Sequence, residues 1–280
     1  MTTRSVESID RRPPLTDLRP IVLIPRLTAF LAIVTAARST GRVLLGLAVA
    51  LVVFGFDRFA RNGWFWLGVG VVICSWNVFD WATIDNHIVL SGYWYLALGA
   101  SLLSDDPERQ MSIQARLLIG LVMAVAVVRK VTNPEFMSGD FFVLTLLVDP
   151  RFEPAVSLVG GVADPSVNRA ALGSLPHSIV LSSASGVRPL ALALTWGAFI
   201  AESTVAVFNL LPAGTWRRAG QIALVAFMVV TYLLVPVVAF GAGLIVMGAA
   251  SAATDRARAM WSVGFFVLAV WGYVWQGATL

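Results

Sequence analysis

The stretch Ile222–Ala253, IALVAFMVVTYLLVPVVAFGAGLIVMGAASAA, carries no charged residue and decides the fold class. A membrane-spanning helix needs roughly 20 apolar residues, so this run is too long for one helix. Pro236 lies inside the run and is the natural place for a break, because proline lacks the amide hydrogen that a helix interior uses. The stretch therefore predicts two apolar helices, Ile222–Pro236 and Val237–Ala253.

The rest of the chain has the same apolar character. Of its 280 residues, 58% are hydrophobic and only 13% are charged, and the mean hydropathy is +0.81. A soluble domain carries roughly twice that charged fraction. Because the apolar residues form long blocks, we expect an all-α, polytopic integral membrane bundle of eight or nine transmembrane helices. The remaining expected spans are about Ile21–Ala37, Val43–Phe56, Trp64–Ala82, Ile88–Leu103, Leu117–Val131, Pro189–Leu211 and Trp261–Trp275.

The distribution of arginine predicts the orientation. Residues 1–19 form a polar segment broken by proline, which we expect to be a cytoplasmic tail and not a cleavable signal. Residues 20–280 then form one transmembrane domain with a long extracytoplasmic loop at 132–188, and we expect a bacterial cytoplasmic (inner) membrane. All the expected inner loops carry arginine, as the positive-inside rule requires: Asp57–Asn62, Ser104–Arg116, Pro212–Ala219 and Thr254–Met260.

Composition and motifs argue against several functions. The formal charge of +4 comes from arginines that are scattered among the loops, as expected near anionic lipid, so we expect no nucleic-acid binding. The single cysteine, Cys74, lies in an apolar segment and leaves no intrachain disulfide or thiolate cluster. The two histidines, His87 and His177, stand far apart without a carboxylate cluster, so we expect no metal site.

Glu202 is the ionisable residue that lies deepest within an expected span, in the sequence WGAFIAESTVAVFNLL. A carboxyl group there is protonated, paired or facing a polar cavity. Arg188, Arg217 or Arg218 can pair with it only if its helix is tilted or broken. A structural hydrogen bond between helices and a functional role are both open for Glu202 at this point.

His87 and Lys130 lie at expected helix ends on the outer side. His87 falls in the first turn of its helix, with Asp85 or Asn86 as N-cap, and the helix dipole there disfavours the imidazolium form. Lys130 adjoins Arg129, and a neighbouring cation with partial desolvation favours the neutral amine that acts as a base. The alternatives are an interfacial histidine and a lysine that extends its ammonium group into water.

Three stretches, in this order, resemble the membrane domain of the vitamin K-dependent γ-glutamyl carboxylases. The first is DNHIVLSGYWYLALGASLL (Asp85–Leu103), which has an Asn-His helix start. The second is VAVVRKVTNPEFMSGDFF (Val125–Phe142), which has a basic pair followed by an aromatic residue and a glycine. The third is FIAESTVAVFNLLPAGTWRRAG (Phe199–Gly220), which has an acidic residue and ends at an arginine turn. The wider group is the HTTM (horizontally transferred transmembrane) superfamily.

The resemblance implies a site and a cofactor. Lys130 matches the lysine proposed to activate vitamin K hydroquinone, His87 matches the active-site histidine that follows an asparagine, and Glu202 matches an acidic position. A quinone or hydroquinone is the implied cofactor, and the aromatic residues Trp94 and Phe136 are candidate walls for its flat ring. The shared site predicts that His87 and Lys130 line one cavity.

The sequence also departs from the family. Arg129 stands where the basic pair has lysine, and Phe136 stands where tryptophan is expected. We also expect no large extramembrane domain after the last helix. Carboxylation of a protein is therefore not expected. The first functional hypothesis is quinol-dependent oxygen chemistry at the outer face. The second is a non-catalytic membrane subunit that binds lipid or quinone or anchors a partner membrane or secreted protein.

Overall fold

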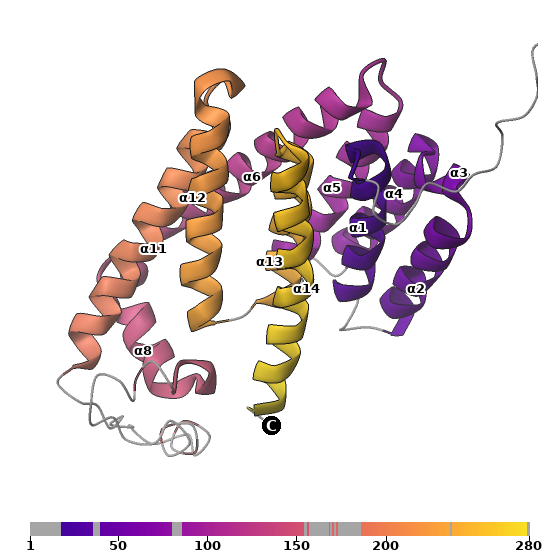
Figure 1. Cartoon of the computed structure of the whole chain (residues 1–280). Coiled ribbons are helices and arrows are strands. Elements are labelled where there is room, and N and C mark those ends of the chain that lie inside the picture. Colours follow the sequence, from indigo (N-terminus) through magenta and orange to yellow (C-terminus); the bar gives the residue numbers. More distant parts are fainter. Residues whose placement is uncertain are drawn as a thin grey trace, which may run out of the picture. The chain divides into compact units, whose positions relative to one another are not determined.

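The computed structural model is all-helical over the residues that it describes, which confirms the predicted all-α class (Figure 1). The described residues are 18–35, 40–79, 86–153, 156, 168, 170, 172, 186–235 and 237–278. Their helices are α1 (Pro20–Val34), α2 (Thr40–Gly55), α3 (Asp57–Ala60), α4 (Gly63–Phe79), α5 (Asn86–Leu102), α6 (Pro107–Val131), α7 (Pro134–Met137), α8 (Asp140–Val148), the 3₁₀ turn η1 (Pro150–Phe152), α11 (Val187–Leu210), α12 (Ala213–Leu234), α13 (Val238–Ser251) and α14 (Asp255–Ala278).

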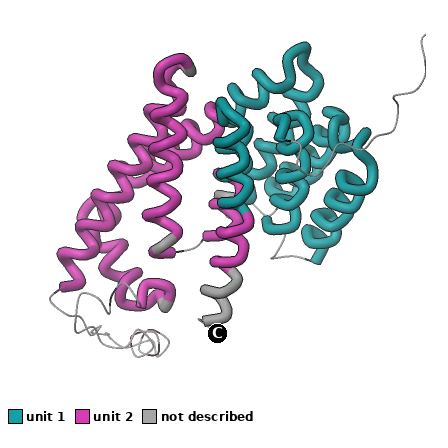
Figure 2. Tube along the Cα trace, viewed as in Figure 1, with its two compact units in different colours: residues 1–115, 245–265 teal, residues 116–244, 266–280 magenta. Residues whose placement is uncertain are grey.

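The chain divides into two compact units (Figure 2). Unit 1 comprises Met1–Ala115 and Ile245–Phe265, and unit 2 comprises Arg116–Leu244 and Phe266–Leu280. The helices α6, α13 and α14 contribute residues to both units.

Unit 1 is held together by close helix–helix packing. A Cβ atom added to Gly99 of α5 would lie 2.7 Å from the backbone nitrogen of Leu67 on α4, and one added to Gly46 of α2 would lie 2.6 Å from the carbonyl oxygen of Ala32 on α1. Only glycine permits such close approach of two backbones, and membrane helices commonly pack through small residues. The Trp94 indole of α5 donates a buried hydrogen bond to the Thr28 hydroxyl of α1, at 3.0 Å.

Unit 2 positions the candidate site. The helices α11 and α12 pack side by side, and α8 packs against α11 (Figure 1). Helix α6 meets α11 at two places along its length: Gly120 lies against Leu210, and Lys130 contacts Glu202. The side chains of α8 and of the start of α11 take part in the hydrophobic core of the unit. Its buried apolar residues are Leu146, Leu147, Phe152, Val156, Val187, Ala191 and Val235.

The predicted break at Pro236 is confirmed by the helices on either side of it. Helix α12 ends at Leu234 and α13 begins at Val238, while Pro236 itself lies outside the described residues. Two described helices, α6 and α11, are long and apolar enough to cross a membrane by length and composition. The apolar helices α1, α2, α4, α5 and α13 are shorter, so the predicted number of spans stays a prediction.

All five predicted loops turn out to contain helix. Helix α3 lies within Asp57–Asn62, α12 begins at Ala213 within Pro212–Ala219, and α14 begins at Asp255 within Thr254–Met260. Helix α6 begins at Pro107 inside the expected loop Ser104–Arg116, because the Asp106 side chain accepts a hydrogen bond from the Arg109 amide at 3.2 Å and Pro107 fits the first helical position. The expected long loop at 132–188 contains α7, α8 and η1. Its apolar stretch Phe141–Val148 falls within α8, which at nine residues is too short to span a membrane, as predicted.

Candidate functional site

Glu202 and Lys130 form an ion pair within unit 2. Lys130 lies in the last turn of α6 and Glu202 lies in α11, and their side chains are only 17% and 12% exposed. The partner of Glu202 is therefore a lysine, and not one of the three arginines that the sequence suggested. The pairing also accounts for the carboxylate inside an apolar helix, because an opposite charge in contact compensates for its loss of hydration.

The Phe136 ring contacts the Lys130 side of this ion pair. Just after α6, the Asn133 side chain accepts hydrogen bonds from the amides of Glu135 (3.0 Å) and Phe136 (3.3 Å) and so starts α7. The resulting turn places the Phe136 ring centroid 5.1 Å from the Lys130 ammonium nitrogen, a cation–π distance. Phe136 is buried. An ammonium, a carboxylate and an aromatic face thus meet at one point.

The second carboxylate oxygen of Glu202 is the unusual atom of the site. Its Oε2 is buried and has no hydrogen-bond partner among the described residues, whereas Oε1 contacts Lys130. Buried polar atoms are nearly always hydrogen-bonded, because an unpaired one costs about 1–3 kcal/mol. Glu202 is therefore able to accept a hydrogen bond from an O–H or N–H donor beside Lys130.

A polar clasp joins α8 to α11 next to the site. Arg188 pairs with Asp140 at the start of α8, and the Ser138 hydroxyl donates to the second Asp140 oxygen at 2.6 Å. Between them, Gly139 adopts a left-handed conformation (φ 84°) that favours glycine. The hydrogen bonds from Ser138 and Arg188 hold the pKa of the Asp140 carboxyl below its ordinary value of 3.8. This clasp helps to position α7, which carries Phe136.

The lowered pKa of Asp140 predicts how the clasp responds to acid. A carboxyl whose pKa is lower in the folded state stabilises the fold above its unfolded pKa, and this contribution is lost as the pH falls through the folded value. The Gly139 and Val143 amides donate to the Phe136 and Gly139 carbonyls. Their protection factors, which correct for the intrinsic exchange rate, are therefore expected to be high at pH 5 and to fall below pH 3.8. Asp140→Asn is expected to have low protection factors at both pH values. Equal protection in the variant and the parent would show that the clasp does not hold α8.

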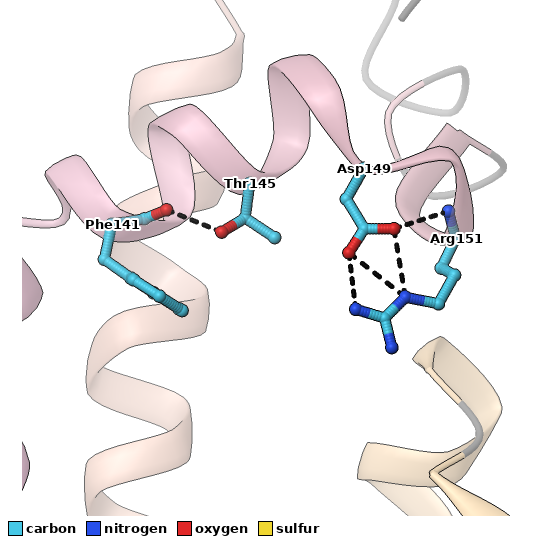
Figure 3. Close-up of polar contacts among 4 residues, drawn as sticks. All are labelled: Phe141, Thr145, Asp149 and Arg151. Atoms are coloured by element: carbon cyan, nitrogen blue, oxygen red, sulfur yellow. Dashed lines mark hydrogen bonds and ion pairs between the residues drawn. The ribbon is translucent and has the colours of Figure 1, made fainter. Parts of the chain in front are cut away.

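The far end of α8 is fixed by a second pair (Figure 3). The Arg151 guanidinium donates to both oxygens of Asp149, with Nε at 3.0 and 3.1 Å, and these contacts raise the pKa of Arg151. Along α8 and its neighbours, aromatic side chains form a continuous series of ring contacts that starts at the site and has centroid separations of 5.3–6.4 Å: Phe136, Phe141, Phe142 and Phe152. The site thus adjoins an aromatic cluster.

The other predicted site residues are placed as follows. Trp94 is buried in unit 1 and its indole bonds to Thr28, so packing accounts for it without a ligand. Asn86 and His87 are the first two residues of α5, and their side chains lie outside the described residues, as does all of Asp85. Arg129 is exposed on α6. His87 belongs to unit 1 and Lys130 to unit 2, so their shared cavity stays a prediction.

The resemblance placed Lys130, Glu202 and Phe136 in one site, but sequence reasoning did not predict the ion pair between Lys130 and Glu202. One local signal was available: Asn-Pro directly after a basic helix end is a typical start of a new helix and turns the chain back. No local signal announces the contact between α6 and α11. No protein-family model matches the chain, and no curated protein or solved structure matches it.

Proposed function

We propose that this protein is a multi-pass membrane protein that binds a lipid-soluble quinol, or a similar phenol, at Glu202 and Lys130. The observation that carries the proposal is the buried Glu202 Oε2, which has no partner among the described residues and lies beside an ammonium group and an aromatic ring. A phenolic hydroxyl donates the missing hydrogen bond, and its ring packs on Phe136. The same proposal places the chain in the HTTM superfamily, on the three stretches that resemble the carboxylase membrane domain.

Exposed apolar side chains support the membrane placement. On α6, Leu121, Val125 and Val128 lie on one helical face and are 52–60% exposed. An apolar face of this kind on a helix long enough to span is expected to contact lipid. Together with the arginines of the predicted inner loops, this supports a bacterial cytoplasmic membrane, with the N-terminus inside and Lys130 toward the outer face.

The ion pair suggests a separate role for each residue when the quinol loses its proton. Lys130 contacts Oε1 of Glu202, whereas Oε2 has no partner among the described residues, so Oε2 is the atom placed to accept the quinol proton. When the quinol hydroxyl passes its proton to Oε2, the negative charge moves from the carboxylate to the quinol oxygen. The ammonium group of Lys130 then stabilises that oxygen anion. This assigns Lys130 an electrostatic role instead of the role of base that the resemblance implied.

A second candidate function is favoured by one observation. The ion pair already neutralises Lys130, which suits a stable binding site as well as it suits a reactive one. A membrane subunit that holds a quinone or lipid, or anchors a partner protein, uses the same residues without turnover. In the catalytic form of the proposal, dioxygen takes two electrons from the deprotonated quinol. The proton held on Glu202 and the second quinol proton complete the hydrogen peroxide that forms, and the quinol leaves as the quinone. Turnover therefore separates the two functions, whereas binding is common to both.

Quinol binding tests the common part. Glu202→Gln keeps the shape of the side chain but replaces the charged acceptor, so we expect the Kd for a short-chain naphthoquinol to rise about 10–100-fold, the loss of a hydrogen bond to a charged group. Titration of the purified protein in lipid nanodiscs measures this Kd. Glu135→Gln is the matched control, because Glu135 is exposed and directly precedes Phe136. Equal affinity of the Glu202 variant and the control would refute the site.

A further inference from the structure

Arg116 caps the end of α11 from a neighbouring helix. Pro212 has no amide hydrogen, so the Phe208 carbonyl lacks the donor that the next turn of a helix would supply. The Arg116 Nη2 group fills this place, donating to the carbonyl oxygens of Phe208 at 3.1 Å and Leu211 at 2.7 Å. Arg116 is only 6% exposed. Its position is therefore fixed by the backbone of α11.

The cap leaves part of the guanidinium group unused. An arginine has five N–H donors, and the two carbonyls take those of Nη2. The Nε atom is buried and has no hydrogen-bond partner among the described residues. Arg116 also forms no ion pair with any carboxylate that the structure describes. Within the described part of the chain, the Arg116 guanidinium group is thus bound by neutral backbone carbonyls and not by a carboxylate.

A second cation and an aromatic pair adjoin Arg116. Arg217 lies in the first turns of α12, and the ring of its neighbour Trp216 packs on Phe208, whose carbonyl accepts a hydrogen bond from Arg116. The preceding residue, Trp216, stacks on Phe208 with ring centroids 5.5 Å apart and an interplanar angle of 11°. Trp216 is 41% exposed. An anion that lies near both guanidinium groups is attracted by each of them.

These residues lie where a membrane surface is expected. In α6, the residues that follow Arg116 are uncharged from Leu117 to Val128, and α11 is apolar from Ser203 up to Leu210 apart from a few small polar residues. Arginine and tryptophan at the end of an apolar helix are typical of the headgroup region, where arginine meets phosphate and tryptophan lies between polar and apolar zones. The arginine distribution predicts that this end faces the cytoplasm.

We propose that Arg116 and Arg217 bind the phosphodiester of an anionic phospholipid, with Trp216 against its glycerol and upper acyl chain. Guanidinium groups suit phosphate oxygens because they are charged N–H donors, and Arg116 keeps Nη1 for this contact while Nη2 donates to the two carbonyls. The inference rests on the membrane placement proposed above, but it concerns a different end of α11 and a different ligand from the quinol site.

Retention of phosphatidylglycerol tests the proposal. The full chain, with Arg217→Gln or Arg109→Gln, is purified in detergent with equal phosphatidylglycerol and phosphatidylcholine, and bound lipid is counted by native mass spectrometry. Arg109 is an exposed residue of α6 on the same predicted side, so its variant makes the same charge change away from Arg116. We expect Arg217→Gln to lower phosphatidylglycerol retention about five- to tenfold and Arg109→Gln to leave it unchanged. Equal retention by the two variants would overturn the site.

Two further arms distinguish a bound phospholipid from a bound free phosphate and from misfolding of the variant. Soluble glycerophosphate at millimolar concentration is expected not to displace the retained lipid, because it lacks acyl chains. Displacement would show a site for free phosphate and overturn the lipid assignment. Naphthoquinol affinity of Arg217→Gln is expected to equal that of the parent, so a failed Glu202 test and a failed Arg217 test are told apart. A loss of both in Arg217→Gln would show general misfolding of unit 2 and overturn the assignment.

Discussion

Lys130→Met is expected to lower quinol-dependent turnover about 10²–10³-fold in the catalytic form of the proposal, while Arg129→Met is expected to change it little. Methionine keeps the apolar stem of Lys130 and its packing on Phe136 but removes the ammonium group that contacts Glu202. Without this ammonium group, the side chain at position 130 no longer stabilises the oxygen anion that forms from the quinol. Arg129 is the exposed neighbour in the same turn and serves as the matched control.

The measurement is the oxidation rate of a naphthoquinol by the reconstituted protein, followed by absorbance. Unchanged turnover in Lys130→Met would exclude Lys130 from the chemistry. If the parent protein binds quinol tightly but shows no turnover, the non-catalytic subunit becomes the better account of the same site.

The ion pair is also expected to dominate the stability of unit 2. Glu202→Leu leaves the Lys130 ammonium in a largely buried place without its carboxylate, which is expected to cost about 3–5 kcal/mol. Lys130→Met leaves the Glu202 carboxylate without its ammonium partner and is expected to lower the free energy of unfolding by a similar amount. The double variant removes both charges and is expected to regain most of the stability, because two apolar side chains of similar size pack there without a desolvation penalty.

A double-mutant cycle measures this coupling. The free energy of unfolding of the four proteins is obtained by denaturant titration in the same detergent, with α-helix content as the signal. A double variant as unstable as the sum of the two single variants would show that Lys130 and Glu202 do not interact. Such additivity would also remove the geometric basis of the quinol site.

The helical class of this chain followed from features that lie close together in sequence. Blocks of apolar residues predict apolar helices wherever they occur, and the break at Pro236 follows from the chemistry of proline alone. The start of α6 at Pro107 was missed because charged residues in its first turns resemble a loop, although Asp106-Pro107 is a recognisable start signal. Both the break at Pro236 and the helix start at Pro107 have a local signal in the sequence. The apolar run predicted the break, whereas the charged first turns of α6 hid the helix start.

The contacts that build the candidate site could not be predicted from the sequence. Lys130 and Glu202 were each identifiable as ionisable residues at or within an apolar helix, yet their contact depends on how α6 packs against α11. The same holds for Arg116, whose partners on α11 are backbone carbonyls that no side-chain pattern reveals. Hydropathy and helix signals describe one element at a time, whereas these contacts form between elements distant in the chain.

A structure of the full chain with a bound naphthoquinol tests the central claim most directly. The quinol site at Glu202 predicts density for a flat ring against Phe136, with one hydroxyl oxygen about 2.5–3.0 Å from Glu202 Oε2. The Lys130 ammonium group is expected within about 4 Å of the same hydroxyl oxygen, while it keeps its contact with Oε1. A ring bound elsewhere, with Glu202 Oε2 hydrogen-bonded to a protein group in the bound state, would contradict the account.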